Sequence, residues 1–187
     1  MKENSNKKNI ILISQILLTI FGTILSIVLF FQTLESPTIL GVLGSVSYVL
    51  AYVAIIFYTI NNYNKKDDFS FQVVIYNYAA VLGIQILQSG NYISGYGLDE
   101  NIAIIINCLN LISFANIIKF ADNLNNKKKA LAYIIIAIIL KLLVELYLII
   151  KMFDLIKLIH IFMSLSIPIL GITIIITYIY RVKRFKK

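Results

Sequence analysis

Apolar positions along the chain gather in long blocks, without the alternation of a half-buried strand or the charged face of a surface helix. About 20 apolar residues span a hydrocarbon core of about 30 Å as an α-helix, which rises 1.5 Å per residue. The blocks predict six membrane-spanning helices, at residues 10–32, 38–60, 70–88, 102–120, 130–150 and 158–180. We therefore expect an all-α polytopic membrane protein, a single membrane domain of residues 1–187 whose six-helix bundle has short loops.

The composition excludes a soluble domain. Hydrophobic residues make up 59% of the 187 residues and charged residues 14%, whereas globular domains average about 45–50% and ~25%. The net charge of +8 does not indicate nucleic-acid binding, because the basic residues gather in the connectors between apolar blocks. The lipid bilayer is the partner that this pattern predicts.

The distribution of Lys and Arg predicts the orientation in the membrane. Fourteen of the 17 basic residues lie in or beside the two termini and the second and fourth connectors, while the first and third connectors carry acidic residues and no Lys or Arg. Basic connectors stay inside, so we expect a multi-pass cell-membrane protein with both termini cytoplasmic. The connector 151–157 is less clear, because it carries Lys151 and Lys157 and no Gly or Pro. The alternative has five spans, with the last apolar region lying in the interface.

Small and polar residues inside the spans mark the faces that turn toward protein, since helices in lipid associate through them. We interpret two such rows as structural. They are Gln15, Thr19, Gly22 and Ser26 in the first span, and Gly41, Gly44, Ser47, Ala51 and Ala54 in the second.

Amide side chains in the third and fourth spans are candidate ligand-binding residues. Gln85 and Gln88 lie on one face in the outer half of the third span. Asn107 and Asn110 begin a row of polar residues at every third position, which winds around a helix of 3.6 residues per turn. We therefore expect the fourth span to be surrounded by protein on most sides, or to border a polar cavity.

Two charges interrupt the apolar fifth span. Lys141 lies near the bilayer centre, where its insertion costs roughly 2.5–3.5 kcal/mol, so it should face the bundle interior and have a partner. Glu145 lies one turn away on the same face. The pair either neutralises itself and does nothing more, or belongs to a functional site.

The sixth span supplies further candidates beside these charges. Pro168 removes the helical hydrogen bond to the Ser164 carbonyl, and Lys141 has donors to offer it. His160 and Ser164 share one face of this span. We expect a ligand site in the outer half of the bundle, formed by Lys141, Glu145, His160, Ser164, Asn107, Asn110, Gln85 and Gln88.

No motif predicts an enzyme, a cofactor or a metal site: the chain has no GxxxxGK, HExxH or GxSxG pattern. The leading hypothesis is a protein that binds or transports a small solute, alone or with a membrane or ATPase partner subunit, with the glycine-containing loop 89–101 as a lid. In size and plan the chain is similar to the substrate-binding components of energy-coupling-factor vitamin transporters and to the membrane sensor regions of histidine kinases, but no motif carries either resemblance. The alternatives are a membrane sensor or scaffold that binds partner helices and, third, an intramembrane enzyme.

Overall fold

The computed structural model describes residues 2–35, 37–61, 68–88, 98–151 and 158–184, with side chains for all of these except 2–8, 61, 68, 158–164 and 184. In this part of the chain all regular structure is helical. The helices are α1 (Lys2–Glu35), α2 (Ile39–Asn61), α3 (Asp68–Leu87), α5 (Glu100–Asp122), α6 (Lys127–Lys151) and α7 (Leu158–Arg184). Each contains a stretch long and apolar enough to cross a membrane. The predicted fold class is confirmed.

The helices differ from the predicted ranges mainly at their ends. α1 begins at Lys2, before the predicted range, so the polar segment that precedes the apolar block is also helical. α7 contains an apolar stretch of membrane-spanning length, which favours six spans over the five-span alternative. The connector 152–157 lies outside the described residues, as does most of the proposed lid, 89–97.

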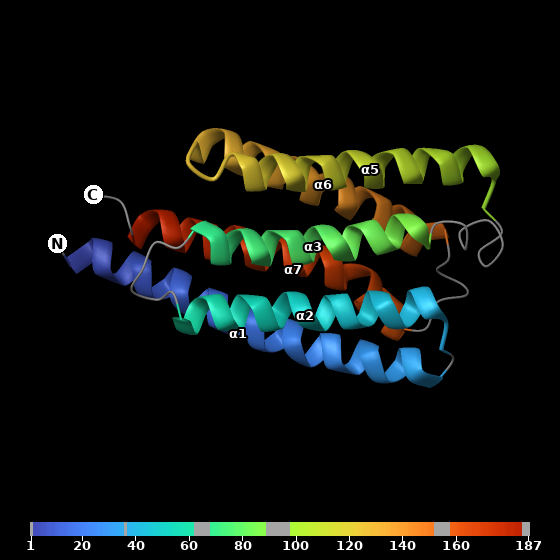
Figure 1. Ribbon diagram of the computed structural model, residues 1–187, viewed down its shortest axis with the longest axis horizontal. Coiled ribbons are helices and arrows are strands. Elements are labelled where there is room, and N and C mark those ends of the chain that lie inside the picture. Colours follow the sequence, from blue (N-terminus) through green and yellow to red (C-terminus); the bar gives the residue numbers. More distant parts are fainter. Residues whose placement is uncertain (1, 36, 62–67, 89–97, 152–157, 185–187) are drawn as a thin grey trace.

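The helices lie side by side along the long axis of the molecule, and both termini lie at the same end (Figure 1). We call this the terminal end, and the opposite one the distal end. The turn between α5 and α6 lies at the terminal end, where the Asn126 side chain accepts a hydrogen bond from the Lys129 amide, 3.3 Å away, and so caps α6. The Asp99 side chain caps α5 at the distal end, accepting from the Asn101 amide at 2.8 Å. Which end faces the cytoplasm stays a prediction.

The described helices form a closed ring, and α3 and α7 lie between the other two pairs of helices. Neighbours in the ring are α1–α2, α2–α3, α3–α5, α5–α6, α6–α7 and α7–α1, and α3 also contacts α7 across it. In Figure 1, α1 and α2 lie below the central pair and α5 and α6 above it. The bundle thus consists of two groups of four helices that share α3 and α7. We call them the α1–α2 half and the α5–α6 half.

The predicted seam of the first span is buried. Gln15, Thr19 and Ser26 are each at most 8% exposed, and Gly22 lies so close to the Tyr52 ring of α2 that a Cβ there would overlap it. Glycine therefore permits the close approach of α1 and α2 at this level.

The fourth span is not the enclosed helix that its polar row suggested. α5 packs mainly on α3 and α6, and it exposes Ile104, Ile105, Leu111 and Ile112. Asn110 and Ser113 are buried, whereas the Asn116 amide donates to the carbonyl of Ile112 in its own helix. Local hydrogen bonding to the backbone lets such a residue face outward, so polar spacing overstated the enclosure of this helix.

Candidate functional site

The two charges of α6 form a closed cluster with one residue of α5. Lys141 is 0% exposed and Glu145 3%. The Lys141 Nζ lies 2.6 Å from the Glu145 Oε1 and donates to the Asn110 Oδ1 at 3.2 Å. The charges face the interior and have partners, as their cost in lipid requires.

The third wall of this cluster comes from the central helices. One turn before Lys141, the Ile138 side chain of α6 meets the Tyr78 hydroxyl of α3 at Gly171 of α7. Each would lie 2.7 Å from a Cβ at Gly171, so the glycine leaves space for both. The cluster is thus enclosed by α3, α5, α6 and α7 and carries no net formal charge.

Lys141 of the fifth span has a partner in the fourth. It donates to the side chains of Asn110 and Glu145, and the expected contact with the Ser164 carbonyl stays a prediction, because it falls on a residue whose contacts lie outside the described part of the chain. The side-chain oxygen of Asn110 accepts the bond from Lys141 because residue 110 lies on the face of α5 that turns toward α6, as does Ser113, whose hydroxyl donates to the Ala137 carbonyl. The side chains of His160 and Ser164 lie outside the described residues.

A second polar region, which we call the outer pocket, opens between α1, α2, α3 and α7 at the distal end. Its volume is about 280 Å³. It contains two predicted residues, Gln85 and Gln88, and it is lined by Leu29, Thr33, Gly41, Gly44, Ser45, Tyr48, Val81, Gln85, Gln88, Ser166 and Ile167. Its polar groups are hydroxyls, amides and a backbone carbonyl. Lys141, Glu145, Asn107 and Asn110 are not among the lining residues.

Tyr48 ties the wall of the outer pocket to α7. Its hydroxyl donates to the Ser166 carbonyl at 2.6 Å, two residues before Pro168, the proline inside α7. Its ring packs edge-on against Tyr52, with centroids 5.4 Å apart. Tyr48 is 3% exposed, so it separates the pocket from the interior of the α1–α2 half.

The outer pocket also has an unmatched hydrogen-bond acceptor. The Oε1 of Gln85 is buried and accepts no hydrogen bond from the described residues. Gln88 extends over α2, where its Nε2 would lie 3.6 Å from a Cβ at Gly44. Buried polar atoms are almost always paired, so the Gln85 oxygen indicates space for a donor that the protein itself does not supply.

The structure therefore divides the predicted site residues between two places. Gln85 and Gln88 lie at the outer pocket, and Asn110, Lys141 and Glu145 form the closed cluster. Asn107 belongs to neither, although its Oδ1 is buried without a partner among the described residues.

Four polar residues of the outer pocket were not predicted, namely Thr33, Ser45, Tyr48 and Ser166. A signal existed in the second span. Gly41 and Gly44, which were interpreted as a packing strip, line the pocket together with Ser45 and Tyr48 of the next turn. A row of small residues next to polar ones on one helix face is consistent with a pocket as well as with close helix packing.

Comparison with known proteins adds no relationship: no family model, no curated protein and no solved structure matches the chain. The function must therefore be inferred from the geometry.

Proposed function

We propose that this integral membrane protein binds a small uncharged polar solute in the outer pocket and takes part in its transport. The observation that supports the proposal is a cavity of about 280 Å³ whose polar lining consists of hydroxyls, amides and a carbonyl. Ligand pockets usually measure about 300–1,000 Å³, so the cavity suits a solute no larger than a simple sugar or a nucleobase.

The lining favours an uncharged solute over an ion. Among the described residues, none that lines the outer pocket is Lys, Arg, His, Asp or Glu, and a charge taken from water without a counter-charge is strongly disfavoured. Hydroxyls and amides both donate and accept, and the Gln85 oxygen is available as an acceptor. A solute rich in hydroxyl or N–H groups fits these partners best.

The experiment is a thermal-shift screen of the purified protein in lipid nanodiscs against defined solutes. The uncharged set is ribose, xylitol, uracil and nicotinamide, and the charged set is glutamate, citrate and spermidine. We expect at least one uncharged solute to stabilise the protein and Gln85→Leu to weaken that effect several-fold. Asn77→Leu is the matched control, because Asn77 is an amide of the same helix that donates to its own backbone and does not line the pocket.

Stabilisation by the charged set alone, or a response that Gln85→Leu leaves unchanged, would contradict the proposal. Uptake of the stabilising solute into proteoliposomes that contain this protein alone would show that it transports the solute unaided. A sensor and a transporter subunit that needs a partner, such as an ATPase, both bind the solute without moving it, and uptake that appears when the partner is added separates the two.

The direction of access follows from the orientation that the sequence predicts. With the basic terminal end inside the cell, the outer pocket opens toward the outside. In a Cys108→Ser background, we expect Glu100→Cys at the distal end to react with an impermeant maleimide in intact cells. We expect Lys128→Cys at the terminal end to react only after permeabilisation. The reverse pattern would place the pocket on the cytoplasmic side.

A further inference from the structure

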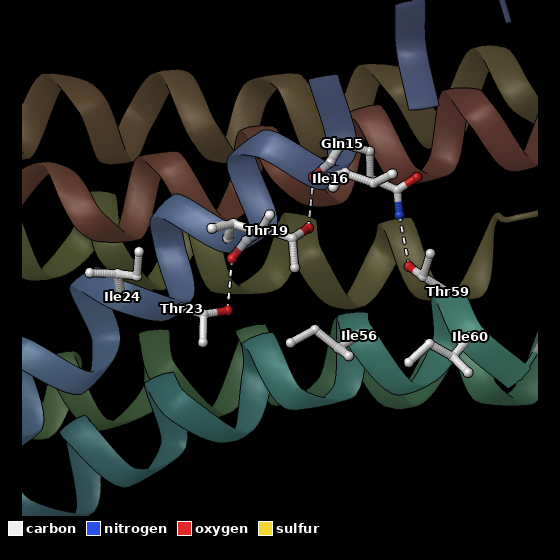
Figure 2. Close-up of a pocket in the computed structure, with 9 residues that line it drawn as sticks. Gln15, Ile16, Thr19, Thr23, Ile24, Ile56, Thr59 and Ile60 are labelled. Carbon is white, nitrogen blue, oxygen red and sulfur yellow. Dashed lines mark hydrogen bonds between the residues drawn. The ribbon is translucent and has the colours of Figure 1, made fainter. Parts of the chain in front are cut away.

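A second hollow of the α1–α2 half lies toward the terminal end, away from the outer pocket. It is a groove of about 380 Å³ between α1 and α2 (Figure 2), and we call it the α1–α2 groove. Isoleucine and threonine side chains supply most of its surface. The groove is lined by Gln15, Ile16, Thr19, Ile20, Thr23, Ile24, Ile56, Thr59 and Ile60.

The threonine hydroxyls of the groove are committed to the backbone. The Thr19 hydroxyl donates to the Gln15 carbonyl at 2.8 Å and the Thr23 hydroxyl to the Thr19 carbonyl at 2.7 Å. The Thr59 hydroxyl donates to the Ile55 carbonyl at 2.8 Å. These residues therefore present methyl groups to the groove and keep no hydroxyl proton for a ligand.

Gln15 differs from the threonines, because only the nitrogen of its side-chain amide has a hydrogen-bond partner among the described residues. Its Nε2 donates to the Thr59 Oγ1 at 2.9 Å, as Figure 2 shows. The proton of Thr59 is already used, so that oxygen only accepts, and this fixes which amide atom of Gln15 is the nitrogen. The remaining atom, Oε1, is buried and accepts no hydrogen bond from the described residues, in a side chain only 2% exposed.

We propose that the α1–α2 groove binds a neutral single-chain lipid of the bilayer whose hydroxyl donates to the Gln15 Oε1. The unmatched acceptor favours a ligand with a donor, and an ammonium donor is disfavoured because no described residue of the groove carries a counter-charge. The isoleucines receive the hydrocarbon chain. Because the Oε1 is buried, it meets the ligand only when the terminal amide, a broad torsion in glutamine, rotates toward the groove; the same rotation moves the Nε2 relative to the Thr59 Oγ1.

The position of Gln15 in the groove orients this lipid. Gln15 and Thr59 lie at the end of the groove nearest the terminal end of the bundle, and Ile24 lies nine residues further along α1. Nine helical residues span about 14 Å, enough for a medium-length alkyl chain. The hydroxyl thus lies toward the membrane surface and the chain points to the bilayer centre. This site is independent of the solute bound in the outer pocket.

The test uses two diazirine-bearing photoprobes on the full-length protein in nanodiscs, one built on 1-dodecanol and one on dodecane. We expect the alcohol probe to label residues 15–24 and 56–60 about fivefold more than the alkane probe does, the ratio expected from one net hydrogen bond. Gln15→Leu should reduce labelling by the alcohol to the level of the alkane. Ile56→Phe, which fills the groove, should reduce labelling by both probes.

Gln32→Leu is the matched control, because Gln32 also has a buried unpaired Oε1 on α1 but does not line the groove. It should leave the labelling ratio unchanged. Equal labelling of the unaltered protein by both probes would overturn the proposal and would leave the groove an ordinary lipid contact, whether or not the variants fold. Loss of the ratio in Gln32→Leu would also overturn it.

Discussion

The two halves of the bundle treat polar side chains in opposite ways. The α5–α6 half encloses two full charges, where Glu145 and Asn110 satisfy Lys141 while the Asn110 Nδ2 has no partner among the described residues. The α1–α2 half contains the outer pocket and the α1–α2 groove, and the described residues that line them carry no formal charge. In this protein the charged side chains lie in a closed contact between helices, and uncharged polar side chains line the open pocket and groove.

The cost of charge in a membrane explains this division. A single buried charge at mid-bilayer depth is expensive enough that it persists only with a partner and away from lipid. Once Glu145 and Asn110 satisfy Lys141, the cluster has no unbalanced charge to attract a ligand, although the Asn110 Nδ2 keeps an unpaired donor. An amide such as that of Gln85 costs far less to leave half-satisfied, so it can stay available for a solute.

The largest effect should come from breaking the charge cluster. Lys141→Leu should destabilise the protein by about 3–5 kcal/mol, because it leaves the Glu145 carboxylate buried without its partner. The double variant Lys141→Leu, Glu145→Leu should recover most of that loss. Denaturant unfolding in detergent micelles, followed by circular dichroism, measures both.

Lys151→Leu is the control, because Lys151 is an exposed lysine at the distal end of the same helix and should change stability by less than about 0.5 kcal/mol. The double variant should also keep its solute response in the thermal-shift screen, since neither residue lines the outer pocket. A folded double variant that no longer binds solute would make the cluster part of the functional site and would end the distinction between the halves.

The sequence was sufficient for the fold, because a membrane span needs only length and apolarity. It also identified Lys141 and Glu145 as interior residues, since the penalty for a lipid-facing charge leaves little choice. It could not find their third partner. Whether Asn107, Asn110 or Asn116 turns toward α6 depends on the rotation of α5, which packing determines and which no single residue of the row reveals.

The second-largest expected effect comes from a glycine that packs tightly against another helix, compared with a glycine that has ordinary contacts. Gly22→Ala should destabilise the bundle by about 1–3 kcal/mol, because the added methyl group overlaps the Tyr52 ring in a packed interior. Gly83→Ala is the matched change in α3. Its Cβ would lie 3.8 Å from the Phe114 ring, an ordinary contact, so it should be neutral or stabilising by up to about 1 kcal/mol. The same unfolding assay decides, and equal losses in both variants would show that α1 and α2 do not approach each other as closely as described.

Tyr48 shows why the outer pocket was harder to predict than the charges. A tyrosine in an apolar span is consistent with plain packing, with an interfacial position or with a polar contact. Only the folded arrangement, in which its hydroxyl reaches the Ser166 carbonyl across α2 and α7, gives it a place in the pocket wall. Tyr48 reaches Ser166 through the backbone carbonyl, an atom that every residue has, so the identity of residue 166 did not predict this contact.

The smallest expected loss of stability comes from removing one hydrogen bond between helices in each half. This pair of variants distinguishes the roles of the two halves most directly. Each half contains a buried hydroxyl that donates to the carbonyl of another helix: Tyr48 to Ser166 at 2.6 Å in the α1–α2 half, and Ser113 to Ala137 at 2.9 Å in the α5–α6 half. Tyr48→Phe and Ser113→Ala should each cost about 1 kcal/mol, the net value of one such bond. Only Tyr48→Phe should also weaken the solute response, several-fold, because Tyr48 lines the outer pocket and Ser113 does not. Titration of the stabilising solute against both variants in nanodiscs measures this difference. A loss of affinity as large in Ser113→Ala as in Tyr48→Phe would mean that solute binding depends on the rigidity of the whole bundle, and not on the wall of the pocket.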